Sequence, residues 1–161
     1  NIDLDYNTID MFDFFRKKDL NIQAGVSDTK EEKNLYFFHN RSAINTLSKL
    51  TGTKAKEVRK ITSTTLNLII ENSRFKDLEI DYISIDVEGH ELSVLKGLDF
   101  KKYKPKLVIL ELIDPSIKEF HQQKIQNIIN SEIYNYMKNE DYKLINWIHD
   151  DLVFVPNNLV I

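Results

Sequence analysis

The sequence contains no cysteine, and only four glycines and three prolines among its 161 residues. Without cysteine, the chain can form neither a disulfide nor a thiolate metal site. No apolar run approaches the roughly 20 residues that a membrane-spanning helix needs, and no signal peptide is visible. From these absences we expect a cytoplasmic protein without a membrane span.

Basic residues are also scarce relative to acidic ones. The chain has 22 lysines and arginines against 25 aspartates and glutamates, which gives a net charge of −3. Proteins that bind nucleic acids usually carry a basic excess, so we expect no nucleic-acid partner. Apolar residues make up 42% of the chain, as in an ordinary globular protein. Residues 1–161 are long enough to bury the core of one domain.

Strand and helix patterns alternate along the chain. The expected strands are Ile2–Leu4, Leu20–Val26, Leu35–Phe38, Val58–Thr62, Tyr82–Asp86, Leu107–Leu112, Tyr142–Trp147 and Leu152–Val155. The expected helices follow a cap at Asn7 or Thr8, cover Leu66–Ile70 and Gly89–Lys96, and run from a capping box at Ser116 and Glu119 to Asn139. This alternation predicts an α/β fold. The last two strands predict an antiparallel hairpin at the edge of a mostly parallel sheet.

The most informative stretch is Ile80–Lys106, where an apolar strand runs into an acidic turn. Asp86, Glu88 and Glu91 gather three carboxylates around Gly89. Carboxylates this close repel one another and are costly to bury, so a turn that served only packing would avoid them. Ligands of open α/β sheets bind at the carboxyl ends of strands. The acidic turn is therefore a candidate site.

Three neighbours of this turn add to the candidate site. Glu111 is the only charged residue in the apolar run Leu107–Leu112, and we expect it to be functional. His90 precedes a helix whose dipole would favour a neutral imidazole that could act as a base, although an exposed histidine without a role is the more ordinary interpretation. Gly89 would allow close approach of the backbone. Lys96 and Gly97 predict a helix end, because a cation is followed by a residue that tolerates positive φ.

The stretch IDYISIDVEGHELSVLKGLDF resembles the central signature of the FkbM-type methyltransferase family. That signature is a strand, then Asp-x-Glu-Gly-x-Glu, then a helix that ends in Leu-Lys-Gly. The matching positions are Asp86, Glu88, Gly89, Glu91, Leu95, Lys96 and Gly97, and further segments that agree are Asn21–Asp28, Ile44–Leu47, Thr65–Leu66 and Leu107–Glu111. The resemblance covers essentially the whole chain and implies the Rossmann-like sheet of class I methyltransferases, with its antiparallel C-terminal hairpin.

The resemblance also implies a cofactor, S-adenosylmethionine, and residues that bind it. Asp3 would accept hydrogen bonds from the ribose hydroxyls at the end of the second strand, with Asp5 beside it. Ser27 and Asp28 would contact the adenine after the third strand. Other interpretations stay open, because Asp3 or Asp5 can simply cap the next helix and Ser-Asp is ordinary turn chemistry.

For catalysis, the resemblance implies an O-methyltransferase that acts on a hydroxyl of a sugar, glycan or glycosylated natural product. Asp86 would lie between the cofactor and the acceptor, and Glu88 would orient the acceptor or the sulfonium. A carboxylate such as Glu111, or His90, would take the hydroxyl proton. Glu91 lies inside the helix and fits a supporting role or an interaction with the helix dipole.

One part of the family pattern is missing from the sequence. Methyltransferases of this fold hold the methionine part of the cofactor with a glycine-rich loop after their first strand. Gly25, Gly52, Gly89 and Gly97 form no such loop. By this resemblance, the sequence opens near the second strand of the fold, with Asn1–Asp5 in its position. We therefore expect an N-terminally incomplete sheet and an incomplete cofactor pocket.

Two alternatives to a methyltransferase remain open. Asp86, Glu88 and Glu111 could bind Mg²⁺, as in a metal-dependent nuclease. Nuclease sites commonly include a lysine, which Val108–Leu112 lacks, and the acidic charge disfavours a polyanionic substrate, so we expect no metal. The missing glycine loop favours the other alternative, a non-catalytic methyltransferase-like domain that binds a partner. The sequence indicates no oligomeric state.

Overall fold

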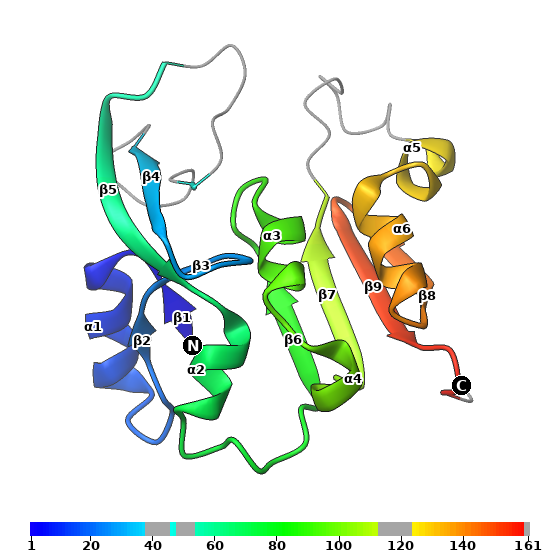
Figure 1. Ribbon diagram of the computed structural model, residues 1–161, viewed down its shortest axis with the longest axis horizontal. Helices are drawn as coiled ribbons and strands as arrows, with labels where there is room; N and C mark the ends of the chain where they lie inside the picture. The colour runs from blue at the N-terminus through cyan, green and yellow to red at the C-terminus, as the bar shows by residue number, and fades with distance from the viewer. Residues whose placement is uncertain (38–45, 48–53, 113–123, 160–161) are drawn as a thin grey trace.

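The computed structural model of the chain describes residues 1–37, 46–47, 54–112 and 124–159. Within these residues, short strands and helices alternate (Figure 1), so the expected α/β class is confirmed. None of the helices in the described ranges has the length and apolar character needed to cross a bilayer.

The N-terminal half is built from short strands and two helices. Its elements are β1 (Ile2–Asp3), α1 (Tyr6–Phe15), β2 (Ile22–Gln23), β3 (Gly25–Val26), β4 (Glu32–Phe37), β5 (Glu57–Thr64) and α2 (Leu66–Glu71). β1 and β2 pair in parallel, and β5 lies between a parallel β3 and an antiparallel β4. The strand expected over Leu20–Val26 is divided, because the chain changes its pairing partner at Ala24. The N–H of Ala24 donates to the carbonyl of Asp3 at 3.0 Å, and the next residue joins β3.

The C-terminal half contains one four-stranded sheet and four helices. Its elements are β6 (Tyr82–Ile85), α3 (Glu91–Lys96), α4 (Phe100–Tyr103), β7 (Leu107–Glu111), α5 (Ile125–Ile129), α6 (Glu132–Asn139), β8 (Tyr142–Ile148) and β9 (Asp151–Pro156). The strand order is β6-β7-β9-β8, with β6 and β7 parallel and β9 antiparallel to both neighbours. The expected antiparallel C-terminal hairpin is therefore confirmed. The described strands form three sheets, with as many antiparallel as parallel pairs, and not the single, mostly parallel sheet that was expected.

The long helix expected before β8 is interrupted. Ser131 lies between α5 and α6, and its side chain accepts a hydrogen bond from the N–H of Tyr134 at 3.1 Å. A serine in this role starts a new helix, because its hydroxyl satisfies a backbone donor that the first turn leaves unpaired. The capping box at Ser116 and Glu119 lies outside the described residues.

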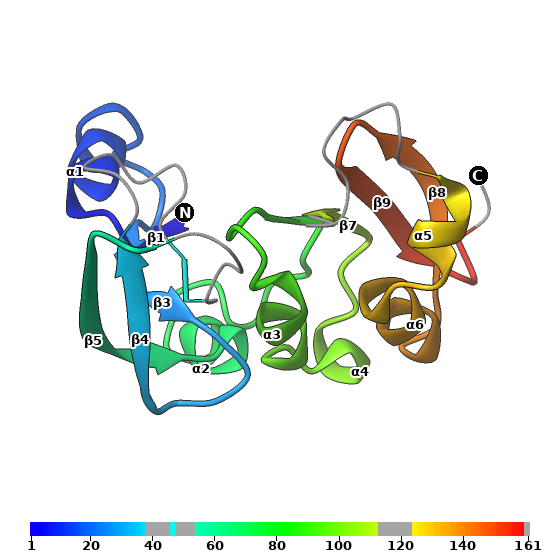
Figure 2. The same cartoon turned by 90° about the horizontal axis from the view of Figure 1, so that it is seen from above.

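The main apolar core lies between the four-stranded sheet and helices α3 to α6. Figure 2 shows α2, α3, α4 and α6 on one side of the strands and α1 on the opposite side. The fully buried apolar side chains of this core are Leu95, Val108, Leu110, Ile128, Met137, Leu152 and Phe154. In β7, the buried Val108 and Leu110 alternate with the partly buried Leu107 and Ile109. One face of β7 is thus fully covered, and the other is covered in part.

Helix α3 packs closely on the N-terminal half. A Cβ atom at Gly97 would lie 2.3 Å from the backbone oxygen of Ser27, so only glycine permits this approach. The helix ends at Lys96, as the stop signal predicted, and the φ of Gly97 is −80°. The carbonyl of Gly97 also accepts a hydrogen bond from the N–H of Asn67 at 3.0 Å.

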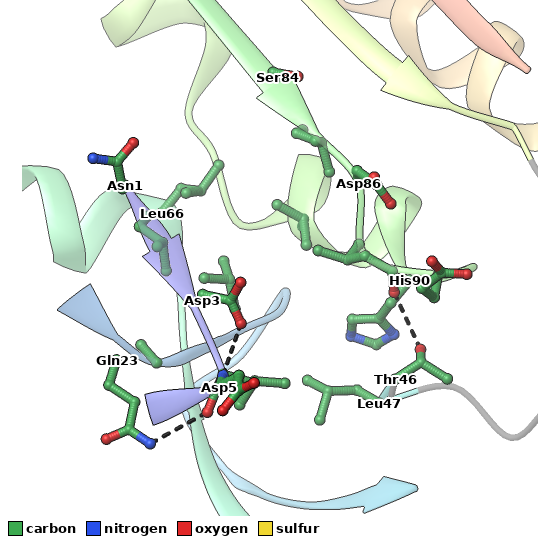
Figure 3. A pocket seen from close by; sticks show the side chains of 18 of the residues that line it. Asn1, Asp3, Asp5, Gln23, Thr46, Leu47, Leu66, Ser84, Asp86 and His90 are labelled. Atoms are coloured by element: carbon green, nitrogen blue, oxygen red, sulfur yellow. Dashed lines mark hydrogen bonds between the residues drawn. The ribbon is translucent and has the colours of Figure 1, made fainter. Parts of the chain in front are cut away.

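β1 and β6 are the edges of two separate sheets that face each other. Figure 3 shows that they run in the same direction, from Asn1 to Asp5 and from Ser84 to Asp86. In the described part of the chain, no strand pairs with either facing edge. A pocket of about 860 Å³ lies between them and is lined by residues of both strands.

Candidate active site

The turn that follows β6 holds the acidic cluster in an unusual backbone conformation. Glu88 and Gly89 both have positive φ, at 56° and 86°. This conformation is strained for a glutamate and easy for a glycine. A Cβ atom at Gly89 would meet nothing within 4 Å. Gly89 therefore serves the shape of the turn and leaves open space beside its backbone.

Asp86, Glu88 and Glu111 converge at the carboxyl ends of β6 and β7. One carboxylate oxygen from each lies within 4.8 Å of the others. β6 and β7 are parallel neighbours with Ile85 opposite Leu110, so Asp86 and Glu111 leave the sheet at the same edge. Three carboxylates in this arrangement could hold a divalent cation such as Mg²⁺, which prefers oxygen ligands.

The cluster shifts the acidity of its own members. The pKa of Glu111 is raised to about 7, first by desolvation and then by the charges of Asp86 and Glu88. Its Oε2 atom is buried and has no hydrogen-bond partner. Desolvation, followed by the charges of Asp86 and Glu91, also raises the pKa of Glu88. A carboxyl group with a pKa near 7 is suited to take a proton at neutral pH.

His90 is partly buried against the end of β3, so the expectation that it would be exposed is wrong. Its Nε2 lies 2.9 Å from the hydroxyl of Ser27, which donates to Oδ1 of Asp28 at 2.8 Å. Since the hydroxyl proton points to Asp28, Nε2 carries the hydrogen in the contact with Ser27, and Nδ1 is the acceptor nitrogen. Desolvation, with a smaller effect of Lys33, lowers the pKa of His90. The imidazole is therefore neutral at pH 7.

Asp3 and Asp5 lie at the end of β1 and line the pocket. Oδ1 of Asp3 accepts a hydrogen bond from the N–H of Asp5 at 2.7 Å. Asp5 accepts from the N–H of Asn7 at 3.0 Å and is the N-cap of α1. The cap expected at Asn7 or Thr8 is thus wrong, and Asp5 has the capping role that the sequence left open.

Ser27 and Asp28 are placed differently from Asp3. Neither is among the described residues that line the pocket. Ser27 is fully buried, and its hydroxyl is engaged by His90 and Asp28. Lys33 lies 3.5 Å from Oδ1 of Asp28. The two residues therefore contact the acidic turn through His90.

Thr46 is a site residue for which the sequence analysis predicted no role. It is 1% exposed, and its hydroxyl donates to the carbonyl of Val87 in the acidic turn at 3.1 Å. The available signal was its position in Ile44–Leu47, one of the segments that resemble the family. Figure 3 shows Thr46 and His90 on the same side of the pocket, across from Asp5, which follows β1.

Comparison with protein-family models finds a match to the methyltransferase FkbM domain over residues 12–144, which is more than half of the chain. No curated protein and no solved structure matches the chain. The matched region includes the acidic turn, His90 and Glu111. The chain therefore belongs to the FkbM methyltransferase family.

Proposed function

We propose that this protein is an S-adenosylmethionine-dependent O-methyltransferase that acts on a hydroxyl of a sugar, glycan or glycosylated natural product. Membership of the family supports methyltransferase activity in general. The observation that supports a hydroxyl acceptor is the cluster of Asp86, Glu88 and Glu111, in which one carboxyl group has a pKa of about 7. A hydroxyl becomes acidic as its oxygen is methylated, so a nearby carboxylate of this pKa can take the proton at neutral pH.

The residues of the pocket fit part of the cofactor. Asp3 supplies hydrogen-bond acceptors for ribose hydroxyls, and Asp86 and Glu88 supply negative charge for a sulfonium. Val26 and Leu66 are among the apolar residues that line the same pocket. Its volume of about 860 Å³ lies within the range of small-molecule sites. No glycine is among the described lining residues, so the methionine part lacks the loop that the family uses.

We infer that the gap between β1 and β6 is the position of the first strand and the glycine-rich loop of a Rossmann-like sheet. β1 and β6 run in the same direction, as two strands on either side of a parallel strand must. Neither facing edge has a strand partner among the described residues. The order β6-β7-β9-β8 keeps the antiparallel hairpin at the far edge of such a sheet.

The proposed roles follow from these positions. When bound, the cofactor supplies a methyl group on a positively charged sulfur. Glu111 takes the hydroxyl proton of the acceptor, while Asp86 and Glu88 orient that hydroxyl. Asp3 binds the ribose. Alignment of this kind supplies a large share of the rate in a transfer between two bound groups.

Cofactor binding tests the position of the missing strand. A polypeptide that adds a first strand and a glycine-rich loop ahead of Asn1 should bind S-adenosylmethionine or its demethylated product, whereas residues 1–161 alone should bind it weakly or not at all. Calorimetry on both proteins measures the difference. Tight binding by residues 1–161 would show that the pocket needs no further strand.

Methyl transfer tests the reaction. With labelled cofactor and a mixed pool of glycans, the protein completed by the loop should transfer label in the presence of EDTA and leave plasmid DNA and RNA intact with added Mg²⁺. Loss of transfer in EDTA would give Asp86, Glu88 and Glu111 a role as metal ligands. Metal-dependent cleavage of nucleic acid without label transfer would contradict the assignment. Cofactor binding without any transfer would favour the non-catalytic binding domain.

A further inference from the structure

Glu91 is the first residue of α3, and its carboxylate is folded back on the turn before the helix. It is 2% exposed. Its Oε1 accepts hydrogen bonds from the backbone N–H groups of Val87 and Gly89, both at 3.1 Å. A buried carboxylate needs such donors, because an unpaired charge is costly to bury. Desolvation raises the pKa of Glu91, and these N–H groups oppose that effect.

The two hydrogen bonds enclose the strained residue of the turn. Glu88 lies between the two donors and has a φ of 56°. A glutamate keeps this conformation only where its surroundings enforce it. Val87, the residue before Glu88, is held by both of its backbone polar groups. The N–H of Val87 donates to Glu91, and the carbonyl of Val87 accepts from the hydroxyl of Thr46 at 3.1 Å. One carboxylate oxygen thus determines the path of the chain through Glu88.

The path of the turn decides where the catalytic carboxylates lie. Asp86, Glu88 and Glu111 approach within 4.8 Å although their charges repel. A turn without internal restraint would relieve this repulsion by rotating Glu88 away. The bonds to Glu91 oppose that rotation, because they need the Asp86–Val87 and Glu88–Gly89 peptide groups in their present orientation.

We propose that Glu91 is the positioning residue of this active site, and that its carboxylate oxygen holds the turn in the shape that aligns Asp86 and Glu88 with Glu111. The meaning of this alignment for catalysis rests on the proposed function, whereas the restraint on the turn can be measured without any activity. The role requires an acceptor oxygen and not a negative charge. Glutamine at this position keeps such an oxygen at the same distance from the backbone, and alanine does not.

Amide hydrogen exchange on the 161-residue chain tests the restraint. Glu91→Ala should speed exchange at Val87 and Gly89 by at least about tenfold, the effect of removing a stabilised local structure. Glu91→Gln should stay within about threefold of the unchanged protein at both amides. The core amide of Leu110 should not change in either variant. Glu132 is the matched control, since it is also the first residue of a helix but is exposed, and Glu132→Ala should leave all these rates unchanged.

Methyl transfer tests the consequence for catalysis. In the protein completed by the glycine-rich loop, Glu91→Ala should lower kcat by at least about tenfold with the KM for the cofactor nearly unchanged, because alignment and not binding is lost. Glu91→Gln should restore most of kcat. Should Glu91→Ala fail to fold, the exchange test is repeated with Glu88→Gly added, since glycine removes the strain of the positive φ.

The outcomes separate the restraint on the turn from the proposed methyl transfer. Equal losses of amide protection at Val87 and Gly89 in Glu91→Gln and Glu91→Ala would overturn the proposal, because the negative charge at the start of the helix would then be what matters. Uniform acceleration of all amides, including Leu110, would overturn it as well and make Glu91 a residue of general stability. If the amides of Val87 and Gly89 exchange as expected but the protein completed by the loop transfers no methyl group, the restraint is supported and the proposed function is rejected.

Discussion

Glu111 ends β7 with one carboxylate oxygen buried and without a hydrogen-bond partner. Its pKa of about 7 in the folded protein lies above the value of about 4.3 for a free glutamate. The folded state therefore binds this proton more tightly than the unfolded state. The resulting contribution to stability is complete below about pH 4.3 and is lost as the pH rises through about 7.

Replacing this carboxyl group should remove that pH dependence. Glu111→Gln should raise the melting temperature at pH 8 by about 2–4 °C, the shift that roughly 1 kcal/mol causes in a protein of this size. At pH 4 the two proteins should melt alike, because Glu111 is then protonated and uncharged. Thermal unfolding at both pH values checks this, with the exposed Glu132→Gln as control. An equal shift at both pH values would contradict a raised pKa.

The neighbouring acids should matter for activity more than for folding. In the protein completed by the glycine-rich loop, Asp86→Asn should lower the rate of methyl transfer by at least about tenfold, which corresponds to about 1.4 kcal/mol of transition-state stabilisation. Asp86 is exposed, so the melting temperature of this variant should differ little from that of the unchanged protein. The pKa of Glu111, measured by NMR, should fall because one repelling charge is gone. Activity that survives both Asp86→Asn and Glu88→Gln would reduce the cluster to a helix cap.

Helix α3 joins the two halves of the molecule at both of its ends. His90, just before the helix, contacts the hydroxyl of Ser27, and Gly97, just after it, packs against the backbone oxygen of the same serine. Asn67 of α2 adds a hydrogen bond to the carbonyl of Gly97 at 3.0 Å. The position of the acidic turn relative to β1 therefore depends on how α3 meets residue 27.

A side chain at Gly97 should disturb this contact. Gly97→Ala would place a Cβ 2.3 Å from a backbone oxygen, which cannot move as a flexible side chain would. We expect a loss of about 1–3 kcal/mol, the usual cost of overpacking. Urea unfolding measures it, with Lys96→Ala as the control because Lys96 is exposed on the same turn. Equal free energies of unfolding for Gly97→Ala and the unchanged protein would mean that α3 and β3 can move apart without a loss of stability.

At the scale of the whole molecule, the two halves differ in how well their strands are supported. β1 and β2 are two residues each and form a sheet of their own, whereas β7 and β9 lie inside a four-stranded sheet. A two-stranded sheet is marginally stable in water. The sheet of β1 and β2 therefore relies on packing against α1, and on the strand that we propose for the gap beside β1.

This difference should appear in hydrogen exchange. In residues 1–161, the amides of β2 should exchange at least about tenfold faster than those of β9, since local openings need less free energy there. Adding the proposed first strand should slow exchange in β2 and leave β9 nearly unchanged. The melting temperature of the longer protein should rise in parallel. Equal protection of β2 and β9 in the shorter protein would contradict this description.

The sequence by itself determined the fold class and pointed to the candidate site. Alternating apolar patterns and turn residues act over short distances, so the strand at Tyr82–Ile85, the acidic turn and the helix after it could be predicted. The signature around Asp86 and Glu88 identified the family for the same reason. The charge of Glu111 stood out because its neighbours in the chain are apolar.

Tertiary structure alone decided which of these residues act together. The change of partner at Ala24, the contact of Gly97 with Ser27 and the burial of His90 join residues that are distant in the chain, and local patterns do not specify such contacts. The positive φ at Glu88 and the return of the Glu91 carboxylate depend on the packing of the turn against Thr46. The raised pKa of Glu111 likewise depends first on its burial and then on the charges of Asp86 and Glu88 from the neighbouring turn. Both effects act through space and not along the sequence.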